Sequence, residues 1–215
     1  MGAPTRDDFA RGLLARLRSM ARDHLAPDAL IVARQYRART GRTLDLRHPT
    51  DLSEKVQWLK LHDRSPLHTI CADKLRSRGY VAARLGEAVL APLLGVARDA
   101  EAVAPESIEA DRFVVKTNHD QGGVHICHDR AAFDWPGVRA DLRRRLAANK
   151  YYEFREHQYR GIPRAITVED LLEDDDGAPV RELKVYCFHG RPQFVQLVLD
   201  RFANKREAFY DLDWR

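Results

Sequence analysis

The sequence has few cysteines and no cysteine motif that would organise a fold. Cys71, Cys127 and Cys187 are the only three among 215 residues, and they are far apart. Because the number is odd and no C-x-x-C pair occurs, the pattern favours neither a disulfide framework nor a zinc ribbon. A reducing, cytoplasmic environment is the expected setting.

Long apolar runs are also lacking. The opening residues, MGAPTRDDFARGLL, do not contain the apolar core of a secretory signal peptide. No uncharged apolar stretch approaches the length that spans a bilayer. We therefore expect no transmembrane segment and a cytoplasmic protein, with a peripheral position at the inner membrane face left open.

Two common nucleotide-binding signatures are missing as well. The sequence contains neither G-x-x-x-x-G-K-[ST] nor G-x-G-x-x-G, so neither a Walker-type nor a Rossmann-type site is indicated. There is no internal repeat and no low-complexity tract, which argues against a solenoid or a linker-like chain.

What the chain does have is the composition of a globular protein. Hydrophobic residues make up 44% and charged residues 32% of a length that suffices for one large domain or two small lobes. Basic residues number 36 and acidic residues 32, for a net charge of +4. This mild excess suits an anionic ligand but does not require nucleic acid.

Helices are predicted in three parts of the chain. Apolar residues recur at helical spacing over residues 7–25, and Pro27 begins a second helix that ends before Gly41. Further helices are expected over about residues 73–85 and, rich in arginine, over about residues 136–150.

A capping pattern predicts one more helix. Asp51 and Glu54 have the spacing of a capping box, which opens a helix through EKVQWLKLHD. Three apolar residues of this helix are expected in the core: Trp58, Leu59 and Leu61.

Strands are predicted mainly in the second half. An apolar strand is expected over residues 90–94, followed by a strand–turn–strand over residues 113–127. After Pro163 the pattern is β-like, with the acidic run EDDDG expected as a hairpin turn. Three strands are expected there, over residues 165–172, 182–190 and 192–200.

The stretch FVVKTNHDQGGVHIC, residues 113–127, permits two interpretations. It is compatible with a plain hairpin whose lysine faces solvent. It is also compatible with a phosphate clamp, because glycines let backbone N–H groups approach an anion and Lys116 adds a positive charge. His119, in the same loop, is assigned either to phosphate or to a structural role.

Two more residues extend the clamp into a possible nucleotide site. Lys74 lies near the start of a helix, and Glu169 lies on a β-like segment before the acidic turn. Two lysines and a glycine loop can hold phosphates, while a strand-borne acidic residue and nearby backbone groups can recognise an adenine edge.

The order of these motifs resembles the ATP-grasp superfamily, and in particular its TupA-like branch. The resemblance rests on GRTLDLRHPTDLSEKVQWLKLHDRSPLHTICADK, APLLGV, VVKTNHDQGG, LKVYCFHGRPQFVQL and DRFANKREAFYDLDW, and covers roughly residues 35–215. It implies an α/β fold with two small α+β lobes. The expected divisions are a helical segment over 1–68, a first lobe over 69–166, and a hinge with the start of an incomplete second lobe over 167–215.

The resemblance also implies a set of ATP-binding residues. The lysine of the D-K pair and the strand lysine would contact phosphates, the glycine loop would close over them, and the hinge would recognise adenine. Lys184, on a strand after the hinge, and the terminal arginine are further candidates. The resulting set is Lys74, Lys116, Asp120, Gln121, Gly122, Gly123, Glu169, Leu172, Lys184 and Arg215.

The implied activity is ATP-dependent joining of a carboxylate to an amine through an acylphosphate, in surface-polysaccharide biosynthesis. Its expected partners are ATP, Mg²⁺ and an acidic saccharide or polysaccharide precursor, with no covalent nucleophile from the protein. Two alternatives stay open: a glycosyltransferase-type enzyme of a polysaccharide cluster, and a nucleotide-binding protein without chemistry.

The chain departs from the family pattern in two respects. Gln121 occupies a loop position where serine is expected. The carboxylate and amide ligands for Mg²⁺ are expected in a region after Arg215, so this chain is expected to bind nucleotide with weak metal dependence and without completing ligation.

Other polar clusters are interpreted as structural or solvent-exposed. His125, Cys127 and His128 do not share one strand face, so a metal site is not expected there. The arginines of residues 139–145 spread over more than one helical face, which disfavours nucleic acid, although an acidic polysaccharide could use them. Arg201 and Lys205 are assigned either to polyanionic substrate or to solvent.

Overall fold

The structure, a computed structural model, describes residues 25–173, 180–199 and 204–215. It divides into two compact units, Met1–Asp170 and Leu171–Arg215. Most of the helix expected over residues 7–25 and most of the EDDDG turn lie outside the described residues.

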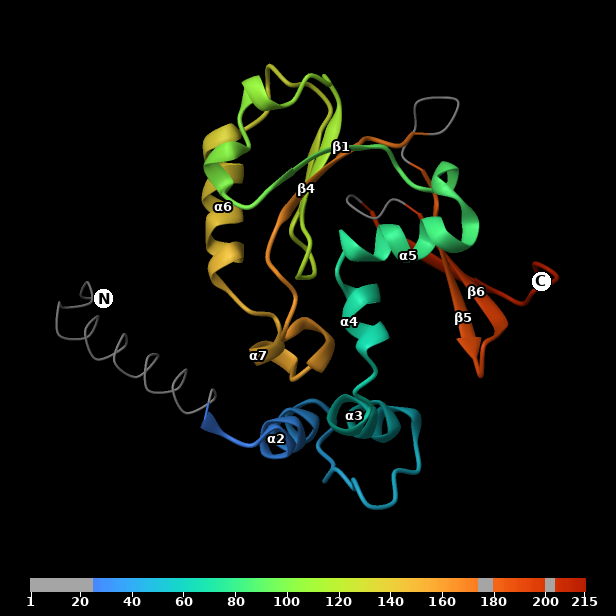
Figure 1. Cartoon of the computed structure of the whole chain (residues 1–215). Helices are drawn as coiled ribbons and strands as arrows, with labels where there is room; N and C mark the ends of the chain where they lie inside the picture. Colours follow the sequence, from blue (N-terminus) through green and yellow to red (C-terminus); the bar gives the residue numbers. More distant parts are fainter. Residues whose placement is uncertain (1–24, 174–179, 200–203) are drawn as a thin grey trace, which may run out of the picture. The chain divides into compact units, whose positions relative to one another are not determined.

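The first unit begins with two helices whose ends follow the predicted signals (Figure 1). Helix α2 (Asp28–Thr40) directly follows Pro27 and ends at Gly41, whose φ of 72° is left-handed and whose N–H donates to the Arg37 carbonyl. Helix α3 (Leu52–His62) is capped by Asp51, which accepts a hydrogen bond of 2.9 Å from the Glu54 N–H. Glycine at the left-handed position and an acidic N-cap are common helix ends, so both predictions are confirmed.

The next helical region differs from the prediction. Helix α4 (Pro66–Ala72) was not expected, although Ser65 followed by proline is a start signal: Ser65 Oγ accepts from the Leu67 N–H. Helix α5 (Arg76–Leu85) begins three residues later than expected. Between the two helices lies Asp73, a buried residue whose Oδ1 accepts a hydrogen bond of 2.9 Å from the Leu75 N–H.

Four strands form the sheet of the first unit. They are β1 (Leu93–Ala97), β2 (Phe113–Thr117), β3 (Val124–Cys127) and β4 (Ile166–Asp170), in the order β1-β4-β2-β3. All three pairings are antiparallel. Strand β1 begins three residues after the predicted start, because Pro92 cannot donate to a ladder and uses only its carbonyl, which accepts from the Asp170 N–H.

Two more helices and several short turns complete the described part of the first unit. Helix α6 (Trp135–Ala147) is close to the predicted basic helix, but ends before the separate short helix α7 (Tyr151–Phe154). Asp134 caps α6 by accepting from the Gly137 N–H. Four 3₁₀ turns connect the described elements: η1 (Glu87–Val89), η2 (Ala100–Ala102), η3 (Pro105–Ser107) and η4 (His157–Tyr159).

Helix α6 packs on one face of this sheet and forms the core with it (Figure 1). Side chains alternate along β2 and β4, so every second residue points toward α6. The residues that meet there are Phe113, Val115, Ile166, Val168, Trp135, Val138 and Leu142. The other face of the same strands carries Val114, Lys116, Thr167 and Glu169, which occupy neighbouring register positions. One face is therefore committed to packing and the other carries charge.

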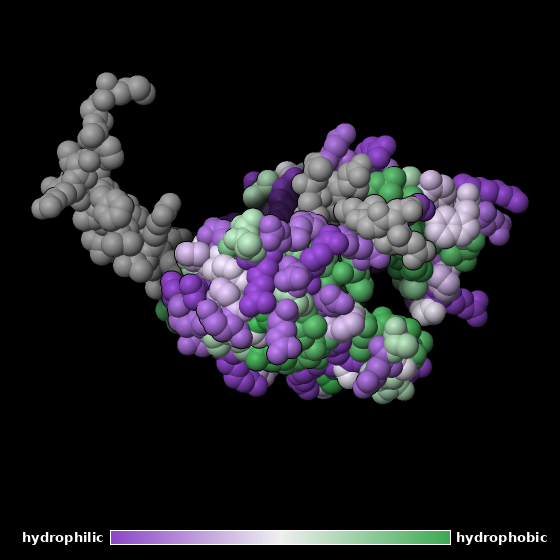
Figure 2. Space-filling model, turned by 90° about the horizontal axis from the view of Figure 1, so that it is seen from above, coloured by the Kyte–Doolittle hydropathy of each residue, from purple (hydrophilic) through white to green (hydrophobic). Residues whose placement is uncertain are grey.

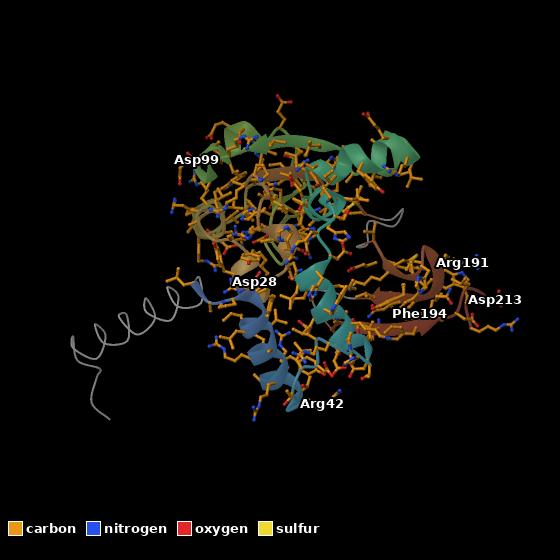
Figure 3. All side chains as sticks on the ribbon, turned by 60° about the horizontal axis from the view of Figure 1, so that its bottom comes forward. Asp28, Arg42, Asp99, Arg191, Phe194 and Asp213 are labelled. Carbon is orange, nitrogen blue, oxygen red and sulfur yellow. The ribbon has the colours of Figure 1, made fainter. Side chains whose placement is uncertain are left out.

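The second unit contains one antiparallel sheet. Its strands are β5 (Glu182–Phe188), β6 (Arg191–Leu199) and β7 (Arg206–Tyr210), in sequence order. His189 and Gly190 form the two-residue turn before Arg191, which is labelled in Figure 3 on the β5–β6 hairpin; both turn residues have positive φ, 51° and 74°. Two left-handed residues suit the twist of a tight hairpin, and the predicted hairpin is confirmed.

The prediction that α3 buries its apolar residues is wrong for two of them. Trp58 is 39% exposed and Leu59 is 47% exposed. The Trp58 ring stacks on His62 of its own helix at 4.4 Å instead of entering the sheet core. Apolar side chains reach the surface elsewhere too: Figure 2 shows hydrophobic residues among hydrophilic ones on the visible face.

A polar cluster ties α2 to α7. The Tyr151 hydroxyl lies 2.6 Å from both carboxylate oxygens of Asp28, at the first residue of α2 (Figure 3). Arg155, only 1% exposed, places its Nε 3.5 Å from Asp28 Oδ1. Burial, and then the nearby carboxylate, raise the pKa of Tyr151. Asp28 thus joins a buried cation to a buried hydroxyl across 123 positions of sequence.

We expect Asp28→Ala to destabilise the chain more than Tyr151→Phe. The first change leaves a buried guanidinium without this carboxylate, a loss of about 3 kcal/mol, whereas the second removes one hydrogen bond of about 1–2 kcal/mol. Urea unfolding followed by circular dichroism measures both. Glu106→Ala, at an exposed acidic residue of the same unit, is the control and should change stability by less than about 0.5 kcal/mol. Equal effects of Asp28→Ala and Glu106→Ala would contradict the assignment.

Candidate functional site

The glycine turn after β2 is closed by its own backbone. The Thr117 N–H donates to the Gly123 carbonyl at 3.2 Å. Gly122 has φ of 80°, a conformation that favours glycine. Gly123 is required for a different reason: a Cβ there would lie 2.4 Å from Thr117 Oγ1 and 2.9 Å from Arg145 Cδ. The geometry of the loop therefore requires glycine at both positions.

Lys116 and Glu169 meet on the sheet face that α6 leaves open. In the register of β2 and β4, Glu169 is opposite Val114, so Lys116 is its diagonal neighbour on the same face. Lys116 Nζ donates to Glu169 Oε2 at 2.6 Å, and Arg78 Nη1 lies 3.7 Å from Glu169 Oε1. The side chains of Lys116 and Glu169 are 26% and 9% exposed. The carboxylate is thus held between two cations, one of which was a predicted phosphate ligand.

Lys74 reaches the glycine loop from the α4–α5 junction. Its Nζ donates to the backbone carbonyls of Thr117 at 2.8 Å and Asp120 at 2.5 Å, and lies 4.0 Å from Asp120 Oδ1. Burial lowers the pKa of Lys74, opposed by the Asp120 charge. Lys74 therefore lies against the loop, with two of its three donors on backbone carbonyls at the end of β2 and in the loop.

Asn118 holds these segments together. This fully buried side chain donates from Nδ2 to Asp73 Oδ1 at 2.8 Å and to the Pro163 carbonyl at 2.9 Å. Its Oδ1 accepts from the Ala165 N–H at 2.7 Å, and its backbone carbonyl accepts from the Lys74 N–H at 3.0 Å. The end of β2 is thereby fixed to the α4–α5 junction and to the segment before β4.

His119 is buried, and its ring contacts oxygen atoms of the protein. It is 2% exposed, with Nε2 3.1 Å from the Arg145 carbonyl and Nδ1 3.2 Å from Asn118 Oδ1. Burial lowers the pKa of His119, so the neutral ring donates to one of these two oxygens. Of its two predicted roles, these contacts support the structural one.

The two polar loop residues face different partners. Asp120 accepts from the Thr117 hydroxyl through Oδ1 and from Arg145 Nη1 at 2.7 Å through Oδ2. Gln121, which replaces the expected serine, is exposed and donates from Nε2 to the Tyr159 hydroxyl at 3.0 Å. Asp120 is therefore held from inside the fold, whereas Gln121 ties the loop to η4.

Seven of the ten predicted residues lie in this first unit: Lys74, Lys116, Asp120, Gln121, Gly122, Gly123 and Glu169. The structure adds Arg78, Thr117, Asn118 and Arg145 as their partners. The polar run after β2 contains Asn118 and could have drawn attention to it. Nothing in the spacing of Arg78 or Arg145 indicates that they reach Glu169 and Asp120.

The other three predicted residues belong to the second unit. Leu172 is 48% exposed. Lys184, on β5, lies opposite Gln196 and places Nζ 3.7 Å from Glu182 Oε1. Arg215 donates its backbone N–H to Asp211 Oδ1 at 2.9 Å. Their roles toward a nucleotide stay predictions.

The arginines of α6 are largely committed to carboxylates. Arg143 pairs with Glu101, Arg144 pairs with Asp141, and Arg145 bridges Asp141 and Asp120. Such internal pairing offers less positive charge to a polyanion than the sequence suggests.

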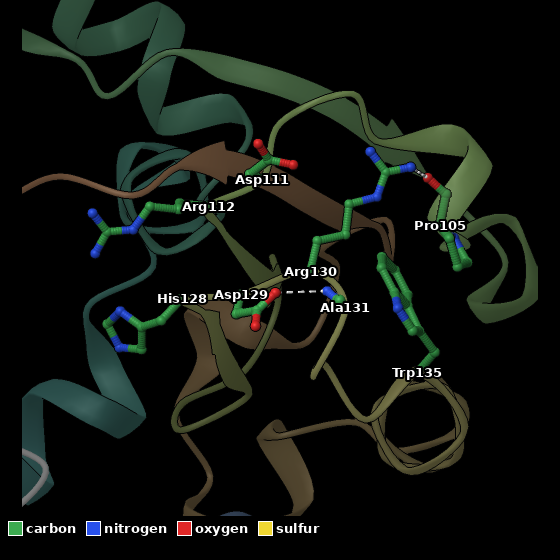
Figure 4. Close-up of a pocket in the computed structure, with 8 residues that line it drawn as sticks. All are labelled: Pro105, Asp111, Arg112, His128, Asp129, Arg130, Ala131 and Trp135. Carbon is green, nitrogen blue, oxygen red and sulfur yellow. Dashed lines mark hydrogen bonds between the residues drawn. The ribbon is translucent and has the colours of Figure 1, made fainter.

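A cavity of about 770 Å³ lies at the opposite end of the β2–β3 hairpin (Figure 4). Asp111 and Arg112, before β2, line it together with residues that follow β3. Arg130 donates to the Pro105 carbonyl, and Asp129 Oδ1 accepts from the Ala131 N–H at 2.8 Å. Both side chains form hydrogen bonds to the backbone of the loops that surround the cavity. None of the ten predicted residues lines it.

Metal-ligating side chains do not cluster among the described residues. No group of three or more His, Cys, Asp or Glu side chains that could hold a metal occurs among them. Asp211 accepts from the backbone N–H groups of Asp213 and Arg215, and Glu207 pairs with Lys205. These two late acidic residues thus have local partners within the second unit.

Among the described helices, none is both long enough and apolar enough to cross a membrane.

Comparison with known families gives a match over most of the chain. The family described as TupA-like ATPgrasp matches residues 54–215. Comparisons with curated proteins and with solved structures find no match. Helices combined with two antiparallel sheets agree with the α+β ATP-grasp fold, as predicted. The chain belongs to the TupA-like ATP-grasp family.

Proposed function

We propose that the first unit binds the phosphates and adenine of ATP along β2, β4 and the glycine loop. The observation that carries this proposal is the meeting of Lys116, Glu169 and the loop at adjoining positions, with Lys74 against the loop. ATP-grasp proteins bind ATP, and the family match covers every one of these residues. The ten predicted residues remain the proposed ATP-binding set, and the loop residues Asp120, Gln121, Gly122 and Gly123 belong to it through their backbone N–H groups.

Lys116 is the proposed phosphate ligand on the open sheet face. Its ammonium has three N–H donors, and Glu169 accepts one of them. The proposed role of Glu169 is twofold: it orients Lys116, and the end of its strand offers acceptors to the adenine amino group. The positive charges of Lys116 and Arg78 around one carboxylate leave a net cationic face, which suits an anionic ligand.

The proposed reaction joins a carboxylate to an amine. A carboxylate oxygen attacks the γ-phosphorus, the bond to the bridging oxygen of ADP breaks, and an acylphosphate forms. The amine nitrogen then attacks the acyl carbon, phosphate leaves, and the nitrogen loses a proton. The residues of this chain contribute by positioning and by neutralising charge; Mg²⁺, which ATP-grasp proteins generally use, would neutralise phosphate charge when bound.

The substrate side of the proposal is an acidic saccharide or polysaccharide precursor in the cytoplasm. A uronic-acid carboxylate provides the acceptor that acylphosphate chemistry needs. The cysteines, Cys71, Cys127 and Cys187, are all free thiols, in keeping with a reducing compartment.

ATP should stabilise the wild-type chain through Lys116. At 100 times Kd, binding adds about 2.7 kcal/mol, which corresponds to a rise of several degrees in Tm. Lys116→Ala should fold and lose most of this rise, because it removes the charge that faces the phosphates. Lys55→Ala, at an exposed lysine of α3, is the matched control and should keep the rise. An undiminished rise in Lys116→Ala would remove this lysine from the site.

Glu169→Gln should reduce the preference for ATP over GTP. The substitution removes the charge that orients Lys116 and adds a donor where only acceptors were present. Competition of each nucleotide against a fluorescent ATP analogue gives the two affinities. Asp170→Asn changes the next residue, whose side chain lies toward the other sheet face, and should keep the preference. Equal affinities of the wild type for ATP and GTP would exclude adenine recognition.

Ligation is tested by product analysis. The chain is incubated with ATP, Mg²⁺, uronic acids and amino acids, and nucleotides are separated by chromatography. The proposal expects ADP to appear once ATP and the carboxylate acceptor are present, because acylphosphate formation releases it, and phosphate to appear only when the amine is also present. ATP binding without ADP release would support binding alone, and release of nucleoside diphosphate from a sugar nucleotide would support glycosyl transfer instead.

A further inference from the structure

Arg145 contacts the glycine loop from the side opposite Lys116. Thr117, whose hydroxyl meets Asp120, points toward the α6 face of the sheet, whereas Lys116 points to the open face. Arg145 belongs to α6 and approaches Asp120 on that inner side. The sequence shows Arg145 only as one of several arginines of this helix, whereas the fold brings its side chain to the loop.

Three parts of Arg145 approach the loop. Its Nη1 donates to Asp120 Oδ2 at 2.7 Å. Its Cδ lies where a side chain on Gly123 would begin, 2.9 Å from an ideal Cβ. Its backbone carbonyl lies 3.1 Å from His119 Nε2. A single residue of α6 thus contacts the loop at His119 and Asp120 and occupies the space beside Gly123.

A second carboxylate fixes the guanidinium itself. Arg145 Nε donates to Asp141 Oδ2 at 2.6 Å, one helical turn earlier. The same Asp141 oxygen lies 3.0 Å from His125 Nε2 on β3. The Arg145 and Asp120 side chains are 21% and 10% exposed, so water screens their attraction less than on an open surface.

The charge of Asp120 would otherwise oppose an anionic ligand. A carboxylate behind a phosphate loop repels phosphate, and Lys74 Nζ is 4.0 Å from its Oδ1. The Arg145 guanidinium makes the shorter contact and therefore supplies the main compensating charge.

We propose that Arg145 is a positioning residue for the phosphate loop, which fixes the loop from behind and neutralises Asp120 so that the triphosphate can approach. The proposal rests on the proposed ATP binding and adds a residue that acts through Asp120 without touching the ligand.

Binding measurements test the charge role. Arg145→Gln should weaken ATP binding about tenfold, the effect of one charge-assisted contact, and should leave adenosine binding unchanged because adenosine has no phosphate. Asp120→Asn combined with Arg145→Gln should restore ATP affinity to within about threefold of wild type. Arg143→Gln, two residues away on α6 and paired with Glu101, is the matched control and should bind ATP like wild type. A double variant as weak as Arg145→Gln would overturn the charge role.

Hydrogen exchange in the ligand-free chain separates this proposal from the proposed function. Arg145→Gln should speed amide exchange over residues 119–123, whereas Arg143→Gln should not. Circular dichroism and thermal melting establish that each variant is folded; if Arg145→Gln unfolds, the double variant is used for both measurements and should show faster loop exchange with near-wild-type ATP affinity. Unchanged exchange would overturn the positioning role even where ATP binds. Absence of ATP binding in the wild type would reject the proposed function, and faster exchange in the variant would still support the loop contact.

Discussion

The hydrogen bonds of Asn118 are the constraint on which the site depends. A buried primary amide must satisfy two donors and its carbonyl oxygen, and here all three find partners, on two segments that are distant in sequence. Asp73 at a helix junction, Pro163 in a loop and Ala165 before β4 are thereby brought to the end of β2. Lys74 follows Asp73 directly, so its approach to the glycine loop is a consequence of the same contacts.

Much of the fold was predictable because local signals agreed with each other. Gly41 and Asp51 mark helix ends by backbone geometry and capping, which act within a few residues. The turn at His189 and Gly190 is local in the same sense. Helix α4 was not predicted because its seven residues are too few to show a helical period. Trp58 was misplaced because the periodicity of a helix does not tell how much of its apolar face another element covers.

The candidate site was predictable in its motifs and not in its contacts. Lys116 and the glycines stand out in the sequence because an apolar strand leads into them. Their partners come from positions far apart: Glu169 is 53 residues from Lys116, and Arg145 is 25 residues from Asp120. Such pairs follow from strand register and helix placement, which are determined by long-range packing. The local spacing of residues therefore does not indicate them.

The diagonal placement of Lys116 and Glu169 has a consequence for how the first unit folds. Their strands are paired so that Phe113 and Val115 point to α6 while Lys116 points away. A slip of β2 by one residue would exchange the two faces and bury an ammonium group among Phe133, Trp135 and Val138, a misfolded arrangement with a heavy desolvation penalty. The lysine therefore opposes a one-residue slip of its strand, so the residue that is proposed to bind phosphate also favours the correct strand register.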